Sequence, residues 1–422
     1  MFTKLKHNII SLLRYSEKYT KTDMVYVTKN TFWVNANTVI VAGGSFILSI
    51  LFARFVPKET YGMYQFILSI GFILGAFSLT GMNAAVTQAV ARGFDGILKT
   101  SVRTQLKFSI IPFVIGLGIS LYYFFQNNIV IAIGVLLTAI ILPLTNSCNT
   151  WSAYLAGKKE FGLSFLYNQI TNFLYYGGSI ITIIFFPQAL TLIIITLVAN
   201  FIGNLIAYIH ISHTHPSNTR SEFEALEYGK KLSLSSALPM ITLHLDNLLV
   251  FHLLGANNLA IYAFASNIPE RFMSFLRPLS TIALPKLSEK DHHTIKTGLS
   301  QKLFRFLGLT TLWGLLYIAI APFVYKTLFP QYIDSLRYSM LYIVFAIIST
   351  LGTLPVTALF ASRSKKIFKF NIINPIVNIL CILLGGYTFG IWGVIIGRIT
   401  AGLFSLLLSF EFTQEQSTPV TQ

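Results

Sequence analysis

The sequence predicts an all-α polytopic membrane protein of about twelve transmembrane helices, arranged as two six-helix lobes that are related by an internal repeat. Of the 422 residues, 54% are hydrophobic and only 11% are charged, which lies outside the usual balance of a soluble domain. From Trp33 onward the chain consists of apolar runs of about 20 residues, each long enough to cross roughly 30 Å of hydrocarbon as a helix. A pattern at the end of the first run also returns half a chain later.

The repeated pattern is an aliphatic helix, a polar turn and an aromatic-rich helix. Residues 51–71 read LFARFVPKETYGMYQFILSIG, and residues 249–269 read LVFHLLGANNLAIYAFASNIP. The matched positions are Leu51 with Leu249, Arg54 with His252, Tyr64 with Tyr262, and Phe66 with Phe264. Because both copies run in the same direction along the chain, they predict two similar bundles side by side.

The predicted helices follow one another with short connections. They lie near residues 33–54, 62–88, 106–125, 129–150, 165–186, 188–210, 231–254, 259–284, 303–325, 336–361, 368–388 and 391–410. At Pro187 and Gly390 a short turn must reverse the chain. The resulting segments are a basic cytoplasmic N-terminus (1–32), an N-lobe (33–210), a cytoplasmic linker (211–230), a C-lobe (231–411) and a cytoplasmic tail (412–422).

The distribution of Lys and Arg predicts which helix ends face the cytoplasm. With the N-terminus inside, 24 of the 31 Lys and Arg residues fall on inner segments and 4 on outer turns, as the positive-inside rule requires. The other three, Arg271, Arg277 and Arg398, fall within predicted helices. Both termini are therefore expected in the cytoplasm, and this bias accounts for most of the net charge of +16 without a nucleic-acid partner.

The connections leave no room for an enzyme active site. The predicted outer turns, such as residues 126–128 and 255–258, are only a few residues long, and the inner connections are too short to form a domain. The chain has no GxxxxGKS/T phosphate loop, no GxSxG elbow and no HExxH zinc site. His213 and His215 fit a solvated loop better than a metal-binding fragment. We expect a protein that is not an enzyme and that has no cofactor and no metal site.

Charged residues at membrane depth are the strongest functional signal, because each is costly there unless it is paired or wetted. They are Asp246 with nearby His244 in the seventh helix, Arg271 beside Glu270 in the eighth, Arg277 nearer the cytoplasm, Arg398 in the twelfth, and Arg54 at the outer end of the first. One alternative is a structural pair between Asp246 and Arg271. Two carboxylates cannot neutralise three arginines within helices, however, and an uncompensated arginine in a cavity suits a phosphate ligand.

Amide side chains gather on one face of the fifth helix and one face of the eleventh. Asn168 and Asn172 are four residues apart, and Asn371, Asn374 and Asn378 share the i, i+3, i+7 spacing. Amides are costly against lipid, so both faces are expected to point at another helix or at water. Two interpretations stay open: hydrogen bonds between helices, or the wall of a polar cavity that contacts sugar hydroxyls.

Several stretches resemble a known family. FARFVPKETYGMYQF (52–66) followed by TGMNAAVTQAVARG (80–93) is similar to the start of the polysaccharide transporter family, the O-antigen and capsule repeat-unit flippases. HLDNLLVFHLLGANNLAIYAFASNIPERF (244–272) and STIALPKLSE (280–289) resemble the seventh and eighth helices of the same family. The family belongs to the multidrug, oligosaccharidyl-lipid and polysaccharide exporter superfamily.

The resemblance implies a function as well as a fold. Two lobes in a V would move a polyprenyl-pyrophosphate-linked oligosaccharide, an O-antigen, capsule or exopolysaccharide repeat unit, from the cytoplasmic to the outer leaflet of a bacterial inner membrane by alternating access. The candidate cavity residues are then Arg54, Arg271, Arg277 and Arg398 together with the five asparagines. Asp246, Glu270 or His244 would carry a coupling proton or sodium ion. The implied partners are the lipid-linked oligosaccharide, membrane lipids, a glycan polymerase and a chain-length regulator.

Two other classes of function stay open. A multidrug or organic-cation antiporter of the same superfamily would use acidic cavity residues without surplus arginine. A membrane-embedded glycan polymerase or ligase would need a cluster of carboxylates or histidines outside the membrane. The predicted outer turns supply only Glu59 and Asp334.

Overall fold

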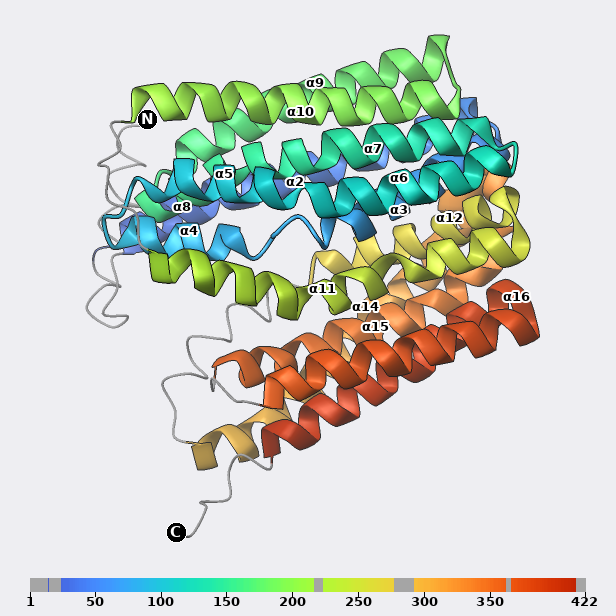
Figure 1. Cartoon of the computed structure of the whole chain (residues 1–422). Coiled ribbons are helices and arrows are strands. Elements are labelled where there is room, and N and C mark those ends of the chain that lie inside the picture. The colour runs from blue at the N-terminus through green and yellow to red at the C-terminus, as the bar shows by residue number, and fades with distance from the viewer. Residues whose placement is uncertain (1–13, 15–23, 216–222, 277–291, 362–365, 415–422) are drawn as a thin grey trace, which may run out of the picture.

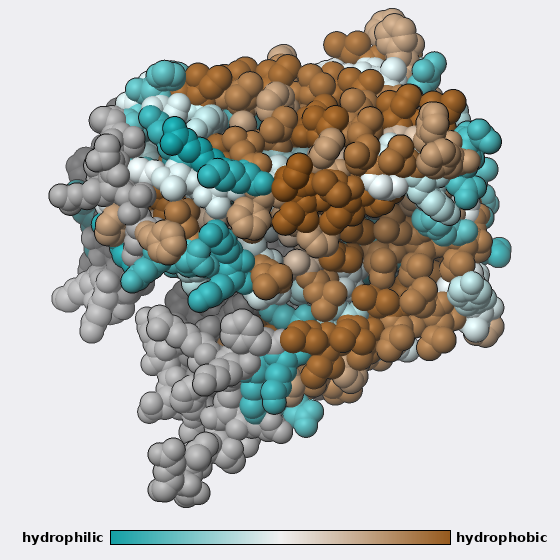
Figure 2. Space-filling model, viewed as in Figure 1, coloured by the Kyte–Doolittle hydropathy of each residue, from teal (hydrophilic) through white to brown (hydrophobic). Residues whose placement is uncertain are grey.

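The computed structural model describes residue 14 and residues 24–215, 223–276, 292–361 and 366–414. Within these ranges the chain is α-helical, with one short 3-10 helix and no strand. Eight helices of the described part are long and apolar enough to cross a membrane. Figure 2 shows apolar residues covering much of the visible face between more polar residues at the two ends, as expected of a protein embedded in a bilayer.

The first lobe contains six membrane crossings. Its helices are α2 (Met24–Phe55), α3 (Lys58–Gly75), α4 (Met82–Ala91), α5 (Ile97–Phe108), α6 (Ile110–Phe125), α7 (Ile129–Cys148), α8 (Thr150–Lys158), α9 (Phe161–Phe185) and α10 (Ala189–Thr214). The pairs α3 with α4, α5 with α6 and α7 with α8 each form one interrupted crossing. These helices make up the upper part of the molecule in Figure 1.

The second lobe lies below the first in Figure 1. Its elements are α11 (Phe223–Leu254), α12 (Ala256–Ser274), α14 (His292–Leu328), η1 (Pro330–Tyr332), α15 (Ser335–Ala361) and α16 (Lys366–Gln414). The last of these is two helices that meet at a reversal, where Gly390 has φ 57° and ψ −133°, a conformation open to glycine. The turn predicted at Gly390 is therefore confirmed, and so is the predicted all-α fold of two lobes.

The second predicted helix, residues 62–88, is not continuous. The α3 helix ends at Gly75 and α4 begins at Met82, with Leu79 between them at a positive φ of 52°. A Cβ on Gly81 would lie 2.6 Å from the backbone nitrogen of Ser233. The break and this glycine together let α11 approach closely, which is a tertiary contact that a hydropathy pattern does not encode.

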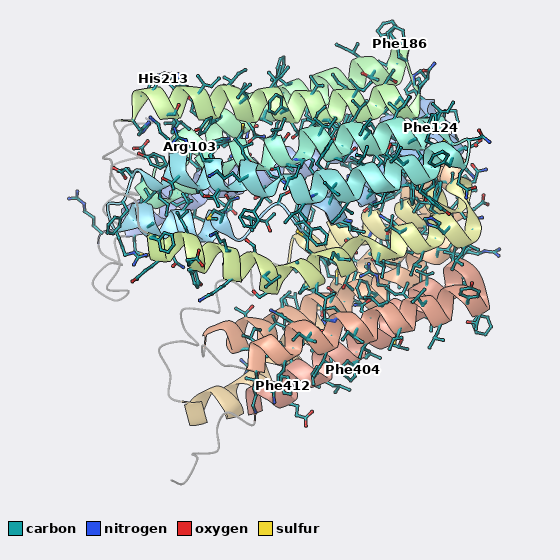
Figure 3. All side chains as sticks on the ribbon, in the orientation of Figure 1. Arg103, Phe124, Phe186, His213, Phe404 and Phe412 are labelled. Carbon is teal, nitrogen blue, oxygen red and sulfur yellow. The ribbon has the colours of Figure 1, made fainter. Side chains whose placement is uncertain are left out.

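The lobes are in close contact at one end of the bundle, which we call the closed end. It contains the turns at residues 56–57, 126–128, 186–188, 255 and 329–334. Phe124 and Phe186 mark this end in Figure 3, whereas Arg103 and His213 mark the opposite end. Toward the opposite end α14, α15 and α16 run away from α9 and α10, so that the two lobes diverge (Figure 1).

The closed end is tightly packed. Phe66 of α3 stacks on Phe251 of α11 with ring centroids 3.8 Å apart, and the ring of Tyr61 lies 5.1 Å from that of Phe264 of α12. A Cβ on Gly62 would lie 1.9 Å from the carbonyl oxygen of Ala256, so the backbones of α3 and α12 touch there. Side chains from both lobes thus close this end of the molecule.

Replacing Gly62 with alanine is expected to separate α3 from α12 and to destabilise the protein by about 1–3 kcal/mol, the usual cost of overpacking a tight contact. Gly118→Ala is the matched control, because a Cβ at Gly118 meets nothing within 4 Å. Thermal unfolding of the two purified variants in one detergent measures the difference. Equal melting temperatures for Gly62→Ala and Gly118→Ala would contradict the packing described at the closed end.

Candidate functional site

Arg271 of α12 joins the two lobes. Its Nη1 donates hydrogen bonds to the carbonyl oxygen of Ser45 (2.6 Å) and to Oγ of Ser49 (2.8 Å), both on α2. The neighbouring carboxylate, Glu270, instead accepts a hydrogen bond from the hydroxyl of Tyr342 at 2.6 Å. Among the described residues, Arg271 therefore has no carboxylate partner.

One edge of the Arg271 guanidinium remains available. Its Nε and Nη2 make no hydrogen bond to any residue that the structure describes. Arg271 lines a cavity of about 760 Å³ between α2, α12 and α14, together with Ser45, Ser49 and Asn37 on α2. An Nε and Nη2 pair is the edge that can bind two oxygens of one phosphate or carboxylate. The cavity and the cation together form a candidate anion-binding site between the lobes.

The rest of this cavity is mainly apolar. Its walls include Phe46 from α2, Phe272 from α12 with Phe275 at the C-cap of that helix, and Ile320 and Val324 from α14. The resemblance implies a polar path for sugars, but this cavity has few groups that could recognise hydroxyls. Its chemistry is instead that of an apolar pocket with one cation.

The five asparagines do not line this cavity. Asn168 donates to the Ser164 carbonyl oxygen of its own helix at 2.8 Å. Within the described part of the chain, Asn172 Nδ2, Asn374 Oδ1 and Asn378 Oδ1 are buried and have no hydrogen-bond partner, and Asn371 is half-buried on α16. Both interpretations of these amides, a polar wall and bonds between helices, stay predictions.

The serines of α2 are site residues that sequence reasoning missed. Ser45 and Ser49 are four residues apart and so lie on one face of the helix. Asn37, on the same helix, accepts a hydrogen bond from Nε2 of Gln169 at 2.8 Å, which ties α2 to α9. The sequence does carry a signal for these residues: they are small polar residues inside an apolar run. This pattern is typical of close helix contacts in membranes.

Asp246 and Arg398 form a buried ion pair inside the second lobe. Asp246 Oδ2 lies 2.6 Å from Arg398 Nη2, and each side chain is only 6% exposed. The hydroxyl of Tyr262 donates to the same carboxylate oxygen at 2.5 Å, and Arg398 Nη2 also donates to the Leu243 carbonyl oxygen at 3.2 Å. The alternative pairing of Asp246 with Arg271 is therefore wrong, and Arg398 is not an uncompensated cation.

The other two candidate ion-coupling residues lie near this pair. The ring of Tyr262, which holds Asp246, is 6.3 Å from the ring of Tyr342, which holds Glu270. His244 stacks on Phe72 of α3 with ring centroids 4.5 Å apart. Carboxylates and tyrosines from α11, α12 and α15 thus form a polar cluster within the second lobe.

Arg54 and its repeat counterpart His252 both bridge the lobes at the closed end. Arg54 Nη2 donates to the Thr327 carbonyl oxygen at 3.0 Å, and His252 Nε2 lies 2.7 Å from the hydroxyl of Tyr123. Arg54 does not line the cavity beside Arg271. Arg277, the remaining arginine candidate, falls outside the described residues.

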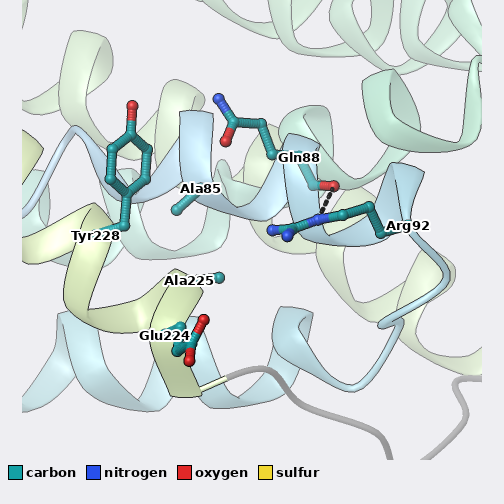
Figure 4. A pocket seen from close by; sticks show the side chains of 6 residues that line it. All are labelled: Ala85, Gln88, Arg92, Glu224, Ala225 and Tyr228. Atoms are coloured by element: carbon teal, nitrogen blue, oxygen red, sulfur yellow. Dashed lines mark hydrogen bonds between the residues drawn. The ribbon is translucent and has the colours of Figure 1, made fainter.

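A second, smaller pocket of about 190 Å³ lies between α4 and α11 toward the opposite end (Figure 4). Its lining residues are Ala85, Gln88, Arg92, Glu224, Ala225 and Tyr228. The only bond drawn there joins Arg92 Nε to the Gln88 carbonyl oxygen at 3.4 Å, within α4 and its C-terminal end. At this pocket, α11 of the second lobe packs against α4 of the first lobe.

No group of three His, Cys, Asp or Glu side chains that could hold a metal ion occurs within the residues that the structure describes. Of the two histidines in the predicted solvated loop, His215 pairs with Glu160 at 3.1 Å.

The fold is shared with solved membrane transporters. The chain aligns with an inward-facing multidrug resistance transporter of the MATE family, in the MOP superfamily, with a TM-score of 0.68 and 14% identity over 89% of this chain and 96% of that one. It aligns with the lipid II flippase MurJ in an inward closed conformation with a TM-score of 0.62 and 15% identity, over 91% of this chain and 90% of that one. At these identities the likeness shows the fold alone.

Sequence comparison shows the family. The amylovoran biosynthesis protein AmsL of Erwinia amylovora is 22% identical over 258 residues, which are 58% of this chain and 66% of AmsL, so the match spans just under two thirds of that relative. The sequence model of a family described as polysaccharide biosynthesis protein matches residues 27–290, more than half of the chain. The chain therefore belongs to the polysaccharide biosynthesis protein family.

Proposed function

We propose that the protein is a flippase that moves a polyprenyl-pyrophosphate-linked oligosaccharide from the cytoplasmic to the outer leaflet of a bacterial inner membrane. Membership of the polysaccharide biosynthesis family and a fold shared with the lipid II flippase MurJ support a transporter of this type. The observation that carries the proposal is the free edge of Arg271 in a cavity between the lobes. The repeat unit belongs to an O-antigen, a capsule or an exopolysaccharide such as the one that AmsL's name mentions.

The barrier to unaided flipping is the transfer of a charged and hydroxylated head group through hydrocarbon. An isolated charge is very costly in a medium that cannot solvate it. In the proposed mechanism Arg271 offers Nε and Nη2 to the pyrophosphate, while Ser45 and Ser49 hold Nη1 in place. A guanidinium held in this way loses little side-chain freedom when it binds two phosphate oxygens.

The conformation suits loading from the cytoplasm. The excess of Lys and Arg at the predicted inner segments supports an orientation with the diverging end of the lobes in the cytoplasm and the closed end outside. Release on the outer side then requires the closed end to open, which breaks the contacts of Arg54 with Thr327 and of Lys58 with Asp334. Both are exposed polar contacts, and such contacts cost little to break.

For the coupling ion, a proton or sodium, we propose Glu270 as the first candidate. Asp246 is engaged by Arg398, and His244 is stacked on Phe72. Glu270 accepts a bond from Tyr342 and has no cationic partner among the described residues. A carboxylate at this depth without a cation is the group that gains most from binding one. The proposed protein partners are a glycan polymerase and a chain-length regulator.

Reconstitution tests the proposal. Purified protein in vesicles is given a polyprenyl-pyrophosphate oligosaccharide with a fluorophore on the sugar, and a membrane-impermeant reductant bleaches the label in the outer leaflet. Exchange between leaflets that depends on the protein is expected, and no faster bleaching than in empty vesicles would contradict the proposal.

A multidrug or cation antiporter is the second candidate, because the fold is also that of a MATE transporter. The test is uptake of a small cationic dye into the same vesicles under a proton or sodium gradient. Dye transport that is unaffected by Arg271→Gln, without glycolipid exchange, would favour the antiporter.

A further inference from the structure

We propose that the cavity between α2, α12 and α14 holds the first isoprene units of the carrier lipid while its phosphates rest on Arg271. This inference rests on the proposed function, because it assumes a phosphate-headed lipid as the substrate. It adds a binding site for the hydrocarbon chain of the lipid. Without this site, the hydrocarbon chain would be expected to stay in the bilayer throughout transport.

The composition of the walls favours a hydrocarbon occupant. Phe46, Phe272, Ile320 and Val324 come from three different helices and face one space. Among the described residues that line it, Arg271 is the only charged one. Sugars would leave their hydroxyls without partners against such walls, and each unsatisfied hydroxyl is costly. A branched hydrocarbon chain bears no polar groups and loses nothing there, while the phosphate it carries matches the single cation.

The volume suits a segment of the lipid rather than the whole glycolipid. About 760 Å³ lies within the range of sites that bury one drug-sized molecule. A few isoprene units fit that space. The oligosaccharide must then lie beyond Arg271, toward the end where the lobes diverge.

The cavity also reaches the lipid-facing surface. Val39 on α2 is 64% exposed, Phe275 at the C-cap of α12 is 60% exposed and Ile320 on α14 is 40% exposed, and all three line the cavity. In a bilayer these exposed parts contact lipid. The isoprenoid chain of the lipid can therefore pass sideways between α2 and α14 while the rest of that chain stays in the membrane.

Arg271 lies far from the closed end along α12. Arg271 is fifteen residues beyond Ala256, the first residue of α12 at the closed end, so it lies roughly 22 Å along the helix from that end. Loading from the diverging end therefore brings the phosphate to Arg271 before it reaches the interface nearest the closed end.

Gly43 offers a means of filling the cavity without strain. It lines the cavity on α2, and a Cβ there meets nothing within 4 Å. Leucine is also a better helix former than glycine. Gly43→Leu should therefore fold and occupy the space proposed for the isoprene units. Gly118→Leu is the matched control, because Gly118 on α6 is exposed, also has open space around it and is not part of the cavity.

The test uses a photoreactive amino acid at Val324 of the full chain in vesicles, with an alkyne-tagged polyprenyl pyrophosphate that carries no sugar. We expect capture of the probe that falls at least fivefold on adding Gly43→Leu and is unchanged by Gly118→Leu. Excess untagged polyprenyl pyrophosphate should abolish capture, and phosphatidylglycerol should not. This competition is measured without any substitution at Gly43, so it stands even if Gly43→Leu does not fold.

Two results would overturn the inference. One is no capture at Val324, and the other is equal competition by phosphatidylglycerol, which would make the cavity a general lipid site. The two proposals fail separately. If the vesicles exchange labelled glycolipid but the probe is not captured, the flippase proposal stands and the chain site is rejected; capture without exchange rejects the flippase proposal instead.

Discussion

Asp246→Asn is expected to lower the stability of the folded protein by about 3–5 kcal/mol, the usual cost of removing one partner from a buried ion pair. Arg398 would keep its bond to the Leu243 carbonyl oxygen and its position 5.5 Å from the ring of Phe345, but it would lose the carboxylate that matches its charge. Thermal unfolding and the yield of monodisperse protein in detergent measure the effect.

Two controls separate the pair from charge effects in general. Asp334→Asn removes an exposed carboxylate that is 64% accessible and 3.3 Å from Lys58, so it should cost less than about 1 kcal/mol. The double variant Asp246→Leu with Arg398→Met removes both buried charges and should recover most of the stability, as apolar replacement of buried pairs often does. Asp246→Asn protein that melts like wild type but no longer responds to an ion gradient would show an ion site instead of a structural pair.

Arg271→Gln is expected to reduce transport by about 10–100-fold, because the loss of a charged hydrogen bond to phosphate costs about 1.5–3 kcal/mol. The protein should stay folded, since the side chain is only half-buried and the ion pair of the second lobe is untouched. Arg271→Lys keeps the charge without the paired donors, so its transport should lie between that of the wild type and that of Arg271→Gln. Surface glycan display in cells, normalised to the level of membrane-inserted protein, gives the comparison.

Ser49→Ala is the control for Arg271. It removes one acceptor of Nη1 but leaves the Ser45 carbonyl oxygen and the free Nε and Nη2 edge. Display should therefore fall by no more than about tenfold. A loss as large as that of Arg271→Gln would mean that the link between α2 and α12, and not phosphate binding, is what transport requires.

The membrane fold could be predicted from sequence because its cause is local. Hydrocarbon requires every crossing to satisfy its own backbone, so apolar runs of sufficient length become helices wherever they occur. The reversal at Gly390 is equally local, because its backbone conformation is open to glycine. The break at residues 76–81 is different, since it depends on the approach of α11 to Gly81.

The arginines show why sites are harder to predict than spans. Depth along a helix can be counted, so Arg271, Arg398 and Asp246 were all recognisable as charges within the membrane. Which carboxylate pairs with which arginine depends on which helices pack against α11 and on how each of these helices is rotated about its axis. The pair of Asp246 with Arg398 is 152 positions apart in sequence, and no spacing rule connects them. As a result, among the arginines that the structure describes, Arg271 is the one that keeps an available edge at the cavity between the lobes.

The repeat was predictive at the closed end. Arg54 and His252 occupy matched positions, and each reaches across to the other lobe, to Thr327 and Tyr123 respectively. Sequence alone marked them as equivalent, although it placed Arg54 among the cavity residues. Their shared role in holding the lobes together could be recognised only from the contacts in the structure.

The most direct test is the rate at which a labelled polyprenyl-pyrophosphate oligosaccharide changes leaflets in vesicles that contain equal amounts of folded wild-type or Arg271→Gln protein. The account predicts rapid exchange for the wild type and exchange at least tenfold slower for Arg271→Gln, with no difference in the orientation or the melting temperature of the two proteins. Equal rates would contradict it, because the phosphate would then cross without the guanidinium edge that Arg271 offers in the cavity.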